Sequence, residues 1–66
     1  MDTLYVLKNE DTGKYYYDGE FVEPRKEYAT ALRLGKAKRI KEKRDIINNR
    51  LYDRSPIVIE KYIEED

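Results

Sequence analysis

The sequence predicts a small α+β fold, in which an antiparallel sheet of three to four strands packs against one main helix in the order β-β-β-α-β. Short stretches rich in β-branched and aromatic residues begin and end the chain. A longer segment between them has apolar residues at helical spacing. Glycine and proline residues separate these stretches. With 66 residues, the chain is expected to form a single domain, 1–66, whose acidic end (62–66) is frayed.

Three strands are predicted early in the chain, because short apolar runs there are separated by turn residues. Asp18-Gly19 suits a tight hairpin turn between the second and third strands. Gly13 can adopt the positive φ that suits the polar loop before the second strand. Pro24 ends the third strand, since it has no N–H for a sheet ladder. The predicted strands cover residues 3–8, 15–17 and 20–23.

The segment 25–34 fits two structures. Leu32 and Leu34 alternate with a charged residue, which favours a short strand over about 30–34. Tyr28 and the alanines that follow it equally fit one helical turn. We expect a loop or helical turn and then the short strand, with Gly35 as a break after it.

A helix is predicted from about Lys36 to Leu51, where apolar residues recur at helical spacing. The aliphatic stem of Arg44 fills a gap in the apolar stripe, and Ile46 widens it. Pro56 ends the helical region, because it disfavours a helical conformation at the residue before it. The other members of the stripe are Ala37, Ile40, Ile47 and Leu51.

The last strand is predicted over residues 57–63, with Ile57, Ile59 and Ile63 on one face. If this strand lies at a sheet edge, it can pair with the same strand of a second copy. A structural or homo-oligomeric role therefore stays open.

Composition argues against most catalytic chemistry. The chain has no cysteine and no histidine, so thiolate and imidazole metal ligands and the usual nucleophilic triads are absent. Its glycines lack the spacing of a phosphate-binding loop. Some carboxylates, which we assign to structure and solubility, lie in turns and at strand ends: Asp11, Asp18, Glu20 and Glu23. We predict a protein that is not an enzyme and has no metal or cofactor. Without a signal peptide or a long apolar run, it is expected in the cytoplasm, without membrane contact.

Charge is strongly segregated along a chain whose formal net charge is zero. Residues 1–24 carry a net charge of −4, residues 25–44 a net charge of +7, and residues 45–66 a net charge of −3. Cations of the helix and of the segment before it are candidate contacts for an anion or an acidic partner. These are Arg33, Lys36, Arg39 and Lys43.

Two interpretations of the basic segment stay open. Such a row could follow phosphates, each contact adding a salt-dependent contribution to affinity, or it could simply be a solvated helix face. Overall neutrality counts against a dedicated nucleic-acid-binding protein. Within the helix, Lys38–Glu42 and Lys41–Asp45 have the i,i+4 spacing of weak surface pairs.

Tyr15, Tyr16 and Tyr17 are the candidate aromatic contacts for a protein partner. Successive strand residues alternate between faces, so Tyr16 is expected to point away from the other two. An exposed tyrosine is suited to a protein interface because its ring is large, rigid and amphipathic. Core packing with the hydroxyl groups reaching solvent is the alternative.

Four motifs stand out along the chain: Tyr5-Val6-Leu7-Lys8, Thr12-Gly13-Lys14-Tyr15-Tyr16-Tyr17-Asp18-Gly19, Ala31-Leu32-Arg33-Leu34 and Ile57-Val58-Ile59-Glu60. They resemble those of small uncharacterised open reading frames of phages and prophages of Gram-positive bacteria. That group has a first strand, a hairpin, a segment leading into a helix, and a final strand. The sequence departs from it in having Leu34 where an aromatic residue is usual and in the very basic start of its helix.

The resemblance implies an accessory role in the bacterial host cytoplasm and supplies no catalytic residue. Small phage proteins often act by binding, so the leading hypothesis is a binding module that acts by protein–protein contact, for example as an inhibitor of a host or defence factor. The alternatives are a nucleic-acid-binding protein that uses the basic residues 33–44 and a structural or homo-oligomeric phage component.

Overall fold

The computed structural model of the protein describes residues 3–47 and 56–63, and within them it confirms the α+β fold with the order β-β-β-α-β. The last strand is shorter than predicted, since it ends at Lys61 and leaves Ile63 exposed beyond it. The elements are β1 (Tyr5–Asn9), β2 (Lys14–Tyr17), β3 (Glu20–Glu23), the 3-10 turn η1 (Lys26–Tyr28), α1 (Leu34–Ile47) and β4 (Ile57–Lys61).

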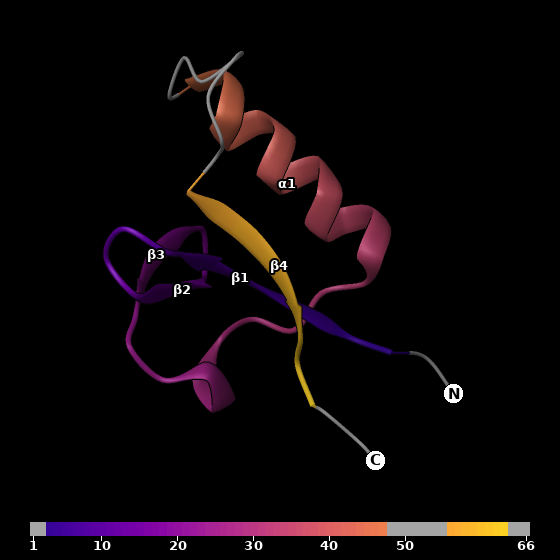
Figure 1. Ribbon diagram of the computed structural model, residues 1–66. Coiled ribbons are helices and arrows are strands. Elements are labelled where there is room, and N and C mark those ends of the chain that lie inside the picture. The colour runs from indigo at the N-terminus through magenta and orange to yellow at the C-terminus, as the bar shows by residue number, and fades with distance from the viewer. Residues whose placement is uncertain (1–2, 48–55, 64–66) are drawn as a thin grey trace.

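The strands form one antiparallel sheet in the order β3-β2-β1-β4, with α1 along one face of β1 and β4 (Figure 1). β1 pairs with β4 along its whole length, from Tyr5 opposite Lys61 to Asn9 opposite Ile57. It pairs with β2 only at its end, at Lys8 and Asn9. The β2–β3 hairpin therefore diverges from the other two strands.

The hairpin has the local geometry that its turn residues favour. Asp18 and Gly19 both have positive φ angles, 49° and 94°, as a two-residue turn with the twist of a hairpin requires. Tyr15 pairs with Glu23 and Tyr16 pairs with Phe21, so Val22 is an extra residue that forms a β-bulge. With Pro24 directly after it, β3 is a short, irregular edge strand.

The predicted strand over 30–34 is wrong: only Leu32 forms a β-bridge, with Tyr5. The Leu32 N–H donates to the Tyr5 carbonyl at 2.7 Å and the Tyr5 N–H donates back at 2.6 Å, while the Thr30 N–H donates to the Tyr16 carbonyl at 2.9 Å. This segment thus lies where β1 and β2 have separated. It ends early because α1 already begins at Leu34, and Gly35 lies inside the helix instead of breaking the chain.

The core lies between α1 and the sheet. Leu7, Ala37 and Ile57 are almost completely buried there. The strand register brings further side chains to the same face, and Tyr16 meets Phe21 edge to face at 5.4 Å. The partly buried residues around this core are Tyr5, Tyr16, Phe21, Leu32, Ile40 and Ile59.

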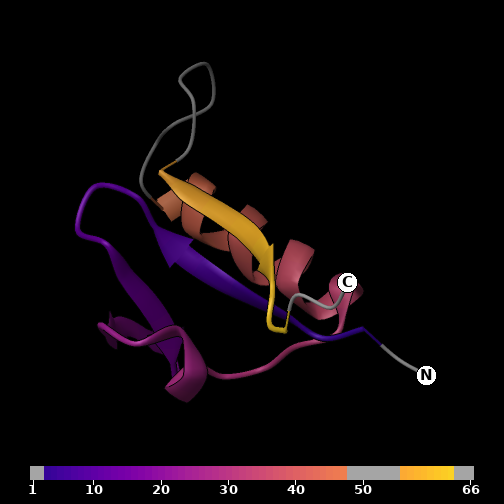
Figure 2. The ribbon, with the colours of Figure 1, turned by 60° about the horizontal axis from the view of Figure 1, so that its bottom comes forward.

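The segment that contains η1 lies on the side of the sheet away from α1 (Figure 2). Lys26 forms an ion pair with Glu60 of β4 at 3.6 Å. The Tyr62 hydroxyl donates to the Glu27 carbonyl at 2.9 Å, and the Tyr62 N–H donates to the Leu4 carbonyl at 2.8 Å. Ordered structure therefore continues to Tyr62, which the sequence assigns to the acidic end, while residues 64–66 lie outside the described residues.

The apolar stripe of α1 is narrower than predicted. Ala37 is buried, and Ile40 and Arg44 are partly buried, as expected. Ile47 is 71% exposed, and it is the guanidinium of Arg44 that lies over the Phe21 ring. Ile46 is also exposed, since nine residues of helical rotation place it about 180° from Ala37. Leu51 lies outside the described residues.

Candidate functional site

The predicted cationic side chains lie on the outside of α1 and just before it. Arg33, Lys36, Arg39 and Lys43 are all exposed. Lys36 and Lys43 are seven residues apart, so their directions around the helix axis differ by only about 20°, and Arg39 lies about 40–60° from both. We call Lys36, Arg39 and Lys43 the cationic row.

Arg44 shows which flank of α1 carries this row. Its Nη2 donates to the Gly19 carbonyl at 2.8 Å, and its guanidinium carbon lies 5.4 Å from the centre of the Phe21 ring. Lys36 and Lys43 point about 80° and 100° around the helix axis from Arg44, and Arg39 points about 140° from it. Lys36 and Lys43 therefore lie about a quarter turn from the side chain that meets the hairpin, on the same side of the buried Ala37 as Arg44, and Arg39 lies further around the helix.

On the opposite flank, one lysine is paired within the helix. The Lys41 ammonium lies 3.0 Å from the Asp45 carboxylate, which confirms the predicted i,i+4 pair. The second predicted pair, Lys38–Glu42, is wrong, since no ion pair joins these two residues, whose side chains both remain exposed.

Within residues 3–47 and 56–63, the members of the cationic row make no ion pair. Other cations do: Arg25 lies 3.8 Å from Glu23, and Lys26 pairs with Glu60. Moreover, the first turn of α1 contains no acidic residue and contains Lys36. A cation at a helix N-terminus is unfavourable, because the macrodipole is positive there.

The three predicted contact tyrosines have different surroundings. Tyr16 packs against the core and is therefore not an open contact residue. Tyr15 is partly buried, with the Lys8 ammonium 5.8 Å from its ring centre. Tyr17 is 49% exposed. Tyr28, which sequence reasoning did not select, is exposed as well, with the Arg25 guanidinium 4.8 Å from its ring.

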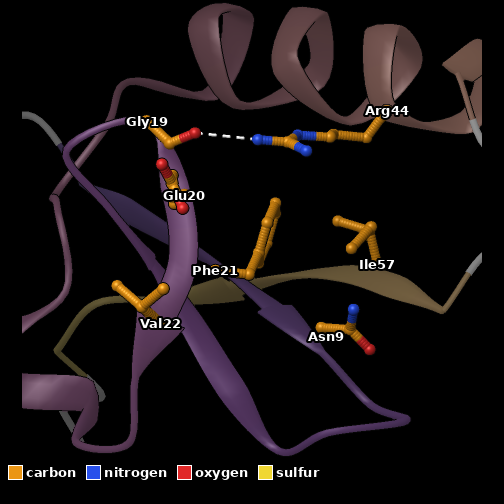
Figure 3. A pocket seen from close by; sticks show the side chains of 7 residues that line it. All are labelled: Asn9, Gly19, Glu20, Phe21, Val22, Arg44 and Ile57. Atoms are coloured by element: carbon orange, nitrogen blue, oxygen red, sulfur yellow. Dashed lines mark hydrogen bonds between the residues drawn. The ribbon is translucent and has the colours of Figure 1, made fainter.

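A groove of about 490 Å³ lies between the hairpin and the C-terminal half of α1 (Figure 3). Its chemistry is mixed, with an aromatic ring and aliphatic side chains beside a guanidinium, an amide and a carboxylate. Sequence reasoning missed it because its walls come from four elements and a turn. The one available signal was an arginine in an apolar stripe. The lining residues are Asn9, Gly19, Glu20, Phe21, Val22, Arg44 and Ile57.

Among the residues that the structure describes, no cluster of three or more acidic side chains could hold a metal ion. No helix in the described ranges is both long and apolar enough to cross a membrane. Comparison with protein-family models, with curated proteins and with solved structures found no match to this chain. The arrangement offers a charged surface and a shallow groove for non-covalent contact.

Proposed function

We propose that this protein is a non-enzymatic binding module that acts by protein–protein contact, with its cationic row against an acidic surface of the partner. The observation that supports this most is the placement of Lys36, Arg39 and Lys43, which are exposed and have no ion pair in the described part of the chain.

This placement is unfavourable for the isolated protein. Lys36 and Arg39, at i,i+3, and Arg39 and Lys43, at i,i+4, are like-charge neighbours that destabilise a helix by about 0.2–0.5 kcal/mol per pair. Lys36 also lies at the positive end of the helix dipole. The chain has 14 acidic residues, and none of them neutralises this row within the described ranges. An acidic partner would relieve the repulsion.

The surroundings of the row favour a partner with a compact acidic surface. Exposed carboxylates lie at the β2–β3 turn, at Asp18 and Glu20, beside the groove that Arg44 lines. A long nucleic-acid strand that followed the row would meet these charges, whereas a small acidic protein surface can contact α1 alone. In the setting that the resemblance implies, the partner is a host or defence factor that this protein inhibits.

Affinity capture from a bacterial lysate tests the proposal. The variant Lys36→Glu/Lys43→Glu should lose the proteins that the unmodified chain retains. Lys14→Glu/Lys61→Glu is the matched control, because both of its lysines are exposed and the net charge changes equally. Equal retention by the two variants would exclude the cationic row as the contact surface.

Nucleic acid is a second candidate ligand, supported by the same unpaired row. From Lys36 to Lys43 the helix rises about 10 Å, which is enough to follow a few phosphates of one strand. Fluorescence anisotropy with labelled single-stranded and double-stranded DNA at low salt tests it. Steeply salt-dependent binding that Lys36→Glu/Lys43→Glu abolishes would favour this function over a protein partner.

A further inference from the structure

We infer that the acidic partner presents a helix to α1, and that this helix carries a row of carboxylates with an apolar side chain one turn before the row. This rests on the proposed function and names the kind of segment that is bound. The surface that binds it is a stripe along α1 in which cationic side chains are followed by apolar ones. We call it the outer stripe, and its residues are Lys36, Arg39, Lys43, Ile46 and Ile47.

The outer stripe is continuous, because each of its members lies one turn from the next. Ile46 and Ile47 follow Lys43 by three and four residues, so both are its neighbours on the helix surface. Around the helix axis, Ile46 points about 180° and Ile47 about 80° from the buried Ala37, and the direction of Lys43 lies between them. The cationic row therefore leads directly onto an apolar pair.

The apolar pair is open to solvent. Ile46 is 63% exposed and Ile47 is 71% exposed, and these are the two most exposed large apolar side chains among the residues that the structure describes. The cationic row beside them makes no ion pair in the same ranges. A ligand that covers the whole stripe therefore gains apolar burial and charge pairing together.

The spacing of the outer stripe matches a helix better than an extended strand. Measured back from Ile47 along the helix axis, Lys43 lies at about 6 Å, Arg39 at about 12 Å and Lys36 at about 16.5 Å. An antiparallel helix reproduces these distances with an apolar residue and carboxylates four, eight and eleven residues after it. In an extended strand, side chains on one face recur at about 6.6 Å, so the third is out of step by about 3 Å.

Other occupants satisfy only part of the outer stripe. A second copy of this chain would bring another cationic row against the first, and a nucleic-acid strand would pair with the cations but leave the isoleucines uncovered. The carboxylates of Asp18 and Glu20 belong to the hairpin turn, which meets α1 at Arg44, about 100° around the helix axis from Lys43. A helix docked along the stripe is therefore not directed at these carboxylates.

Titration of the ¹⁵N-labelled full chain at low salt tests the inference with an alanine-based peptide of about 20 residues, long enough to form a helix. The peptide carries one leucine and glutamates four, eight and eleven residues after it. In the matched peptide alanine replaces the leucine, which keeps the helix propensity. The leucine peptide should shift the amides of Arg39, Lys43 and Ile47. It should also bind about fivefold more tightly than the alanine peptide, because part of a leucine side chain leaves water.

The variant Ile46→Ser/Ile47→Ser should bind the two peptides equally, with the affinity that the unmodified chain has for the alanine peptide. Both side chains are exposed, and serine and isoleucine have similar helix propensities, so the fold is kept. Ile63→Ser is the matched control, because Ile63 is 62% exposed and lies beyond β4, and it should change either affinity less than about twofold. A leucine peptide with proline at its centre should bind at least about fivefold more weakly, since it cannot form the helix.

Equal affinity for the leucine and alanine peptides, with loss of both in Lys36→Glu/Lys43→Glu, would overturn the inference while leaving the proposed function intact. Undiminished binding of the proline peptide, or shifts confined to the hairpin or to β4, would overturn it as well. If neither peptide binds, the inference is wrong, and capture from the lysate decides the proposed function by itself.

Discussion

The two flanks of α1 differ in whether a lysine on them forms an ion pair within the described part of the chain. On one flank, Lys41 is neutralised by Asp45 one turn later. On the other flank, Lys36 and Lys43 have no ion pair in the described part of the chain, and Arg44 is the cation that contacts the rest of the fold. One helix thus carries cations that stabilise its own fold and cations that do not. The second kind is where a function can be expected.

The sharpest test of this division compares two arginines of α1. Arg44→Ala should lower the free energy of unfolding by about 1.5–2 kcal/mol, because it removes a hydrogen bond to Gly19 and a cation–π contact with Phe21. Arg39→Ala should change it by less than about 0.5 kcal/mol, as expected of an exposed surface residue. Urea denaturation measures the free energy of unfolding of both variants. Equal losses would contradict the division of the cations of α1 into those that stabilise the fold and those that do not.

A smaller effect, of opposite sign, is expected at Lys36. Lys36→Glu should raise the free energy of unfolding by about 0.5–1 kcal/mol, because it places an anion in the first helical turn and removes a like-charge neighbour of Arg39. The same change should weaken partner binding. Gly35→Ala should stabilise the helix by a similar amount, about 0.5–1 kcal/mol, without changing the charge, and binding should be retained. A destabilised Lys36→Glu protein would show that this lysine supports the fold.

The smallest effect is expected on the other flank. Lys41→Ala should cost about 0.3–0.5 kcal/mol, the usual value of an i,i+4 pair, and the loss should shrink in high salt. Thermal unfolding at low and high salt measures it. A loss that salt leaves unchanged would mean that the aliphatic stem of Lys41 contributes by packing.

Local patterns in the sequence were enough to predict much of this fold. Short runs rich in β-branched and aromatic residues predicted the strands, and Asp18-Gly19 predicted the hairpin turn. The Ala37–Ile40–Arg44 stripe identified the helix. The segment around Leu32 was harder, because its conformation depends on Tyr5 and Tyr16, which are distant in sequence.

The candidate site also has one part that could be predicted from the sequence and one part that could not. Exposure of the cationic row follows from helical rotation around Ala37, so sequence reasoning reached it. The groove requires the hairpin to diverge from β1 and to meet Arg44, which depends on where the β1–β2 pairing ends. Likewise, the packing of Tyr16 against the core depends on its register with Phe21.

The bulge at Val22 and the proline after β3 have a consequence for assembly. They make one side of the sheet a poor template for another strand, while β4 on the other side is regular. A molecule in which a single sheet edge can pair with another strand joins one neighbour, and after that it has no free edge of this kind. Strand-to-strand association of this chain would therefore stop at a closed pair and would not grow into a fibre.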